Sequence, residues 1–130
     1  YYNDSIASSP SRTIAGLRSF PEKVILIAGG YDKHIPYDVL GPEICAHVKK
    51  LFLGGATGPK IRAAVENAPA YLPGMPEIVD CGDFTKATLA AARAAEPGDV
   101  VLMSPASAAF DQFKNFMVRG QYFKKLVKEL

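Results

Sequence analysis

Four short apolar runs alternate with longer stretches of helical period along this chain, and glycine or proline follows each run within two residues. The runs cover residues 23–28, 51–53, 77–80 and 99–103. Strands that alternate with helices are typical of βαβ units, in which helices connect parallel strands. Because the runs are almost continuously apolar, we expect helices to cover both faces of the sheet. The sequence therefore predicts an α/β domain of three layers, with a mostly parallel sheet flanked by helices.

The stretches between the runs carry residues that suit helix ends. Ser9 and Pro10 predict a helix start, because serine caps helices and proline fits the first helical turn. Asp83 is expected to cap a later helix, which Pro97 ends. In the last helix the side chains expected to face the core are Phe116, Phe123, Leu126, Val127 and Leu130. The predicted helices cover residues 10–19, 38–49, 58–67, 84–96 and 116–130.

The composition limits the class of protein. With 130 residues, 48% of them hydrophobic, the chain has the size and apolar content of one packed domain. Its net charge of +2 includes no basic cluster beyond Lys124, Lys125 and Lys128, so we expect no nucleic-acid partner. The apolar runs are far shorter than the roughly 18 residues of a membrane span, so we expect no membrane partner.

Cysteine usage indicates a reducing compartment. Cys45 and Cys81 lie far apart in the sequence and lack the paired spacing of a zinc site. We therefore predict two free thiols and no metal site. The N-terminus carries neither the charged nor the apolar region of a signal peptide, which favours a cytoplasmic protein.

Ligands of open α/β sheets bind beyond the carboxyl ends of the strands, so the loops after the apolar runs are the candidate sites. Gly29 and Gly30 follow the first run, where glycine permits close approach of the backbone or a positive φ. Lys33 in this loop is either an anion contact or a solvated lysine, and His34 is assigned no role. The loop at 104–116 mixes small residues with phenylalanines. Because small residues let backbone amides face a carboxylate, it is the most ligand-like loop of the chain.

Two other loops carry less chemistry. The loop at 54–60 is rich in glycine, but Pro59 interrupts the phosphate-loop pattern and Ile61 replaces its metal-binding hydroxyl. A strand-to-helix turn is therefore the favoured interpretation, although its free amides suit an anion. The polar segment at 2–9 is expected to cap the first helix. Since no catalytic triad, paired carboxylates or metal-ligand cluster emerges, we predict no catalytic residue in this chain.

Segments in chain order resemble the C-terminal domain of the Mur ligases. They are Asn-Asp-Ser at 3–5, Gly-Gly-x-x-Lys at 29–33, Ser-Pro-Ala-Ser at 104–107, Asp-Gln-Phe-Lys-Asn-Phe at 111–116 and Arg-Gly at 119–120. The resemblance extends over essentially all 130 residues, and the segment at 111–116 is its most specific part. That segment is similar to the family member that joins D-glutamate to UDP-N-acetylmuramoyl-L-alanine.

The resemblance implies an ATP-dependent amide ligase of peptidoglycan synthesis. In that reaction MgATP phosphorylates the carboxylate of UDP-N-acetylmuramoyl-L-alanine, and the amine of D-glutamate attacks the acyl phosphate. The family's C-terminal domain is Rossmann-like and closes on a central ATPase domain, which excludes water from the acyl phosphate. The resemblance thus implies that residues 1–130 form one such domain, with the N-terminal and central domains of the same chain as partners.

The family's phosphate loop, magnesium ligands and uridine-binding domain belong to upstream segments. The chain starts at Tyr1 without an initiator methionine. We therefore expect a fragment of a longer protein that folds alone and catalyses nothing alone.

The same resemblance implies a set of D-glutamate contacts. Lys33 matches a lysine that contacts the D-glutamate carboxylate, and Ser8 stands at the position of a threonine that meets the same ligand. Phe116 matches a phenylalanine whose backbone lies at D-glutamate, and Phe110 takes the place of a leucine there. Ala109 stands where a better-known pattern has a serine, so the contact of that hydroxyl is lost or moved.

For ATP, the resemblance implies that Asp4 lies near the ribose, beside Asn3. Ile6 departs from the pattern, which has a lysine there. Two other interpretations stay open. The first is that the chain belongs to another Mur ligase or to a folylpolyglutamate synthase. The diaminopimelate-adding Mur ligase, however, is expected to carry an Asp-Asn-Pro-Arg segment, which this sequence lacks. A stand-alone flavodoxin-like ligand-binding module is the other.

Overall fold

The computed structural model describes residues 1–109 and 112–130. Within them, the strands form one parallel sheet in the order β1-β5-β2-β3-β4. The strands are β1 (Tyr2–Asn3), β2 (Val24–Ala28), β3 (Val48–Gly54), β4 (Glu77–Gly82) and β5 (Val101–Met103). The helices are α1 (Pro10–Arg18), α2 (Leu40–His47), α3 (Gly58–Glu66), α4 (Phe84–Ala94) and α5 (Phe116–Lys128).

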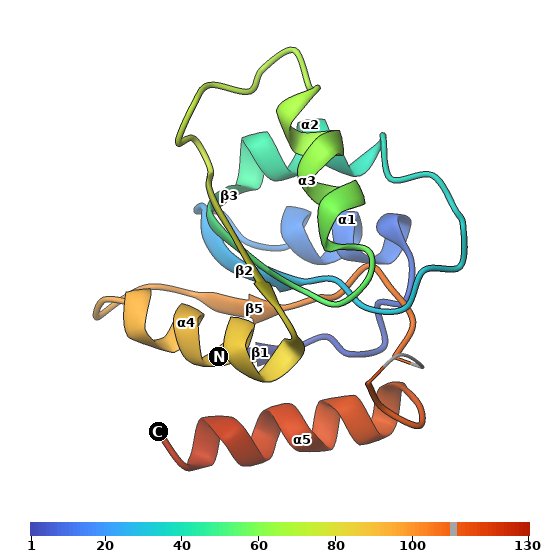
Figure 1. Ribbon diagram of the computed structural model, residues 1–130. Helices are drawn as coiled ribbons and strands as arrows, with labels where there is room; N and C mark the ends of the chain where they lie inside the picture. Colours follow the sequence, from blue (N-terminus) through green and yellow to red (C-terminus); the bar gives the residue numbers. More distant parts are fainter. Residues whose placement is uncertain (110–111) are drawn as a thin grey trace.

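The sheet is the middle of three layers (Figure 1). Side chains of α1, α2 and α3 pack against one face, and those of α4 and α5 pack against the other. In the central strand β2, Leu26 faces the first group of helices and Ile27 faces the second, and both are at most 1% exposed. Burying one such side chain contributes roughly 1.5–3 kcal/mol. The predicted three-layer α/β fold with a parallel sheet is confirmed.

Several helix boundaries agree with their sequence signals. Asp83 caps α4, since its carboxylate accepts a hydrogen bond from the Lys86 N–H at 2.7 Å. Pro10 is the first residue of α1. Ser9 has the extended backbone of a capping residue, but its hydroxyl lies 3.3 Å from that of Ser11 and caps no backbone N–H.

Three details of the prediction were wrong. The second helix ends at His47, and Lys49 lies inside β3, which pairs with β2 and β4. The segment at 2–9 does more than cap a helix, because Tyr2–Asn3 pairs with β5 as an edge strand. The opposite edge strand, β4, has only exposed and half-buried side chains, although Ile78 packs against one core cluster and Val79 against the other.

The last helix also buries a different set of side chains. As predicted, Phe123 is buried, and Leu126 and Val127 pack half-buried against the same core cluster. Phe116 and Leu130, in contrast, are 39% and 60% exposed. Phe116 is the first residue of α5 and Leu130 lies beyond its end, so neither reaches the sheet. Arg119, one turn into the helix, is buried instead.

Cys45 and Cys81 are both free thiols, as predicted. Burial raises the pKa of each thiol above its ordinary value. In the described part of the chain, no helix is both long and apolar enough to cross a membrane.

Candidate functional site

The carboxyl ends of the parallel strands lie at one edge of the sheet, and the loops that follow them meet there (Figure 1). The loop after β2 carries Lys33, and the loop after β5 runs from Ser104 to Ala109. The short loop after β1 carries Asp4, and the turn after β3 leads through Thr57 into α3. Residues 110 and 111, which include the predicted D-glutamate contact Phe110, lie outside the described residues.

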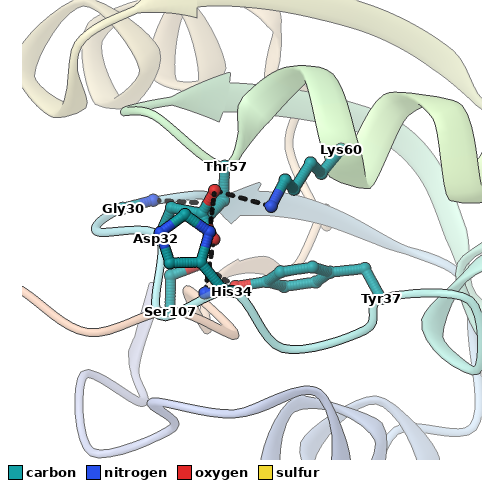
Figure 2. Close-up of polar contacts among 7 residues, drawn as sticks. All are labelled: Gly30, Asp32, His34, Tyr37, Thr57, Lys60 and Ser107. Carbon is teal, nitrogen blue, oxygen red and sulfur yellow. Dashed lines mark hydrogen bonds and ion pairs between the residues drawn. The ribbon is translucent and has the colours of Figure 1, made fainter.

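A chain of hydroxyl groups joins three of these loops (Figure 2). The Thr57 hydroxyl accepts a hydrogen bond from the Gly30 N–H at 2.9 Å and lies 2.8 Å from the hydroxyl of Ser107. Ser107 in turn lies 3.0 Å from the Tyr37 hydroxyl. All three side chains are at most 4% exposed. Because buried polar groups without partners are costly, this network favours one arrangement of the loops.

The backbones of the β2 and β5 loops are in direct contact. Tyr31 N–H donates to the Ala108 carbonyl at 2.8 Å, and Gly29 N–H donates to the Pro105 carbonyl at 2.9 Å. A Cβ at Gly30 would lie 2.5 Å from the Ala108 carbonyl oxygen. The glycines thus permit a close backbone approach, as predicted, but the partner that they approach is the neighbouring loop.

Lys33 lies at the exposed tip of the β2 loop. Its ammonium group makes no ion pair or hydrogen bond with any described residue. The carboxylate of Asp32 beside it lies 2.6 Å from the Lys60 ammonium and accepts a hydrogen bond from the His34 N–H at 2.8 Å. The hydrogen bond from Lys60, followed by that from the His34 backbone, holds the pKa of Asp32 below its ordinary value.

The β5 loop is buried throughout, from Ser104 to Ala109. The carbonyl of Ala109 accepts hydrogen bonds from the N–H groups of Gln112 and Phe113, at 3.1 and 2.8 Å. The Ala109 methyl is buried, at 3% exposure. The predicted role of Ala109 at D-glutamate stays a prediction, and its side chain packs inside the domain.

Arg119 is a site residue to which the sequence analysis assigned no role. Its guanidinium donates to the Ser107 carbonyl at 2.8 Å and to the Ser5 carbonyl and hydroxyl at 2.6 and 3.0 Å. Ser5 donates in turn to the Phe116 carbonyl at 2.6 Å. One sequence signal was present, because Arg119 falls on the helix face that also carries Phe123, and arginine is rarely buried without partners.

Asn3 is the last residue of the edge strand β1, and Asp4 follows it. One carboxylate oxygen of Asp4 accepts a hydrogen bond from Ser104 at 2.7 Å, and the other bonds to no described residue. Asp4 also lines a groove of about 480 Å³ beside α1. The Asn3 side chain donates to the Gly120 carbonyl at 2.9 Å and accepts from the Ser5 N–H at 3.2 Å. Both ends of the Asn3 amide therefore already hold the fold together.

Phe116 and Ile6 line a second groove, of about 350 Å³, which adjoins the first at Asn3. Lys33, Ser8 and Ala109 line neither groove. Ser8 is half-buried, and its hydroxyl bonds to no described residue. Asp4 and Phe116 thus line two adjoining grooves beside β1, Lys33 lies in the loop after β2, and Ala109 lies in the β5 loop between them.

Among residues 1–109 and 112–130, no three or more His, Cys, Asp or Glu side chains come together in a group that could hold a metal ion.

Curated proteins match the chain over its whole length. It is 54% identical over 136 aligned residues to the UDP-N-acetylmuramoylalanine--D-glutamate ligase of Acetivibrio thermocellus. It is 50% identical over 130 residues to the protein of that name from Clostridium botulinum strain Okra, and 48% identical to that of Clostridium kluyveri. Each alignment covers 100% of this chain and 28% of the relative, so the chain spans little more than a quarter of their length. No protein-family model matches the chain.

Proposed function

Because the whole chain is homologous to 28% of the UDP-N-acetylmuramoylalanine--D-glutamate ligases, we propose that it is the C-terminal domain of such a ligase. The single observation that carries this proposal is an identity of about 50% over the entire chain. The complete protein then acts in the cytoplasm, in peptidoglycan synthesis. This domain supplies D-glutamate contacts and part of the ATP site.

In the proposed reaction, MgATP converts the carboxylate of UDP-N-acetylmuramoyl-L-alanine to an acyl phosphate, and the D-glutamate amine attacks it to form an amide. The role of this domain is to hold D-glutamate in place and to exclude water when it closes on the rest of the enzyme. The phosphate loop and the magnesium ligands belong to the remainder of the ligase. The isolated chain is therefore expected to be inactive.

Lys33 is proposed to hold the side-chain carboxylate of D-glutamate. Two observations support this role: Lys33 is exposed at the carboxyl edge, and its ammonium group pairs with none of the residues that the structure describes. A hydrogen bond between an ammonium and a carboxylate is charge-assisted, so a neutral residue cannot replace it. Ser8, Ala109, Phe110 and Phe116 are proposed as further contacts of the same ligand.

Asp4 is proposed to accept a hydroxyl of the ATP ribose. Ser104 holds one of its carboxylate oxygens, and the other is left for a ligand donor. The groove that Asp4 lines gives such a ligand access. Asn3 is proposed to assist by fixing the backbone between β1 and α5, since both ends of its side chain are bonded there.

The alternatives receive less support. Another Mur ligase, a folylpolyglutamate synthase and a stand-alone flavodoxin-like module are all compatible with a three-layer α/β domain, so the fold does not separate them. The name shared by the relatives favours the D-glutamate ligase.

The test uses the full-length ligase and Lys33→Ala. The KM for D-glutamate should rise, with an apparent loss of binding of about 1.5–3 kcal/mol, while the KM for ATP stays nearly unchanged. Lys128→Ala, which removes an exposed lysine from the last turn of α5, is the matched control and should change neither constant. An unaltered D-glutamate KM and kcat in Lys33→Ala would return Lys33 to a solvated loop residue.

The isolated chain supplies a second test. It should unfold cooperatively and should release no phosphate from MgATP in the presence of D-glutamate. Turnover by the highly purified chain would contradict its assignment as a C-terminal domain.

A further inference from the structure

The carboxylate of Asp32, the residue before Lys33, bonds to the backbone of His34, the residue after it (Figure 2). One oxygen accepts a hydrogen bond from the His34 N–H at 2.8 Å, which closes a turn around Lys33. The other oxygen lies 2.6 Å from the Lys60 ammonium, which ties this turn to α3. The position of Lys33 therefore depends on one carboxylate and on the lysine that pairs with it.

The rest of this loop is anchored at its two ends. Gly30 is bonded to Thr57 at the start, and the Tyr37 hydroxyl meets Ser107 at the end. Between these anchors, Ile35 packs against the core, while Lys33 and His34 are exposed. Asp32 thus provides the polar contact that fixes the middle of the loop.

His34 adopts a φ of +59°, in the left-handed region that residues other than glycine rarely occupy. The hydrogen bond from its N–H to Asp32 stabilises this conformation locally. Losing the Asp32 carboxylate would free the backbone at His34 and, with it, the direction of the Lys33 side chain.

Lys60 also changes the electrostatics of the loop. Asp32 places a negative charge next to Lys33, and this charge would repel an incoming carboxylate. The pairing with Lys60 offsets that charge at 2.6 Å and leaves the Lys33 ammonium available to a ligand.

From these contacts we propose that Asp32 and Lys60 are positioning residues for the carboxylate site at Lys33. This inference rests on the proposed function, because it takes the D-glutamate carboxylate as the ligand. Lys60 acts through Asp32 and does not touch D-glutamate. The pair sets the direction of Lys33 and compensates the negative charge beside it.

The test measures steady-state constants of the full-length ligase. Lys60→Met should raise the KM for D-glutamate about two- to fivefold, the range expected for a partly exposed ion pair, and should leave kcat and the KM for ATP unchanged. Lys60→Arg preserves the charge and should retain most of the affinity. Arg62→Met is the matched control, because Arg62 is an exposed cation of the same helix that pairs with Glu66.

The double variant Asp32→Asn/Lys60→Met separates positioning from direct contact. Asparagine retains an oxygen for the His34 N–H but removes the uncompensated charge, so the double variant should have a lower D-glutamate KM than Lys60→Met. A D-glutamate KM in the double variant at or above that of Lys60→Met would show that the uncompensated charge of Asp32 does not cause the loss, and would overturn the proposal.

One further outcome would also contradict the positioning role of Asp32 and Lys60. A Lys60→Met enzyme that loses thermal stability but keeps its D-glutamate KM would assign the pair a purely structural role. A failure of the proposed function can be told apart from this outcome, because in that case Lys33→Ala would leave the D-glutamate KM unchanged.

Discussion

Two loops at the same edge of the sheet are held in opposite ways. Residues 104–109, after β5, are all buried, and backbone groups of the β2 loop and the Arg119 guanidinium bond to them. Residues 31–36, after β2, are exposed or half-buried, and the Asp32 carboxylate fixes their middle.

The difference suits the two loops to different roles. A buried backbone keeps its shape whatever the pH or salt concentration, because solvent does not reach its hydrogen bonds. The shape of an exposed loop that is held by an ion pair depends on the pH and on the salt concentration, but such a loop can present an ammonium group to a ligand. We therefore expect the β5 loop to govern stability and the β2 loop to govern D-glutamate affinity.

The largest effect should come from Arg119→Met, which removes the cation that bonds to the β5 loop. The buried carbonyls of Ser107 and Ser5 would lose their donors, so the free energy of unfolding should fall by about 3–4 kcal/mol. Urea denaturation of the purified chain measures this change. Arg18→Met, which removes an exposed arginine paired with Glu43, should leave the midpoint almost unchanged. Equal losses in the free energy of unfolding in Arg119→Met and Arg18→Met would show that buried and exposed arginine contacts contribute equally to stability, which would contradict the comparison of the two loops.

A smaller loss should follow from Ser107→Ala, which cuts the hydroxyl chain. The buried hydroxyls of Tyr37 and Thr57 would each lose a partner, at a cost of about 1–2 kcal/mol in the free energy of unfolding. Ser11→Ala, at an exposed position of α1, is the control in the same denaturation experiment. A Ser107→Ala variant as stable as the wild-type chain would mean that the network adds nothing to stability.

The smallest effect is the pH response of the β2 loop. Because the pKa of Asp32 is lower in the folded chain than in the unfolded one, its stabilising contacts are complete above about pH 4. They are lost as the pH falls through the folded value. The amide signal of His34 in nuclear magnetic resonance spectra should therefore shift in acid, while the signal of Ala108 should not. Asp32→Asn should abolish the shift, and its persistence in that variant would assign it to another group.

Most of the fold followed from local sequence signals. The central strands were predictable because Val24–Ala28 and Val101–Met103 are buried on both faces and are therefore continuously apolar. Asp83 was predictable as a cap because its action reaches only three residues along the chain. Tyr2–Asn3 was not, since a strand of two residues has no period and is defined by its pairing with β5.

The candidate site was predictable in position but not in its internal contacts. Glycines after buried strands marked the carboxyl edge of the sheet, where the loops meet, and Lys33 lies there. The pairing of Asp32 with Lys60 joins residues on different loops, and neither residue carries a local signal of the other. Arg119 was missed as an anchor because the face that it shares with Phe123 was taken as wholly apolar.

The contact at Gly30 limits how this site can be exchanged between related enzymes. Any side chain there would press on the Ala108 carbonyl, and the Tyr31 N–H bonds to that same oxygen. We therefore expect substitutions in the β2 and β5 loops to be coupled, although about 75 residues separate the loops in the chain. A chimera that takes its β2 loop from one parent and its β5 loop from another creates a mismatched junction. Recombination that preserves the candidate site must therefore take both loops from the same parent.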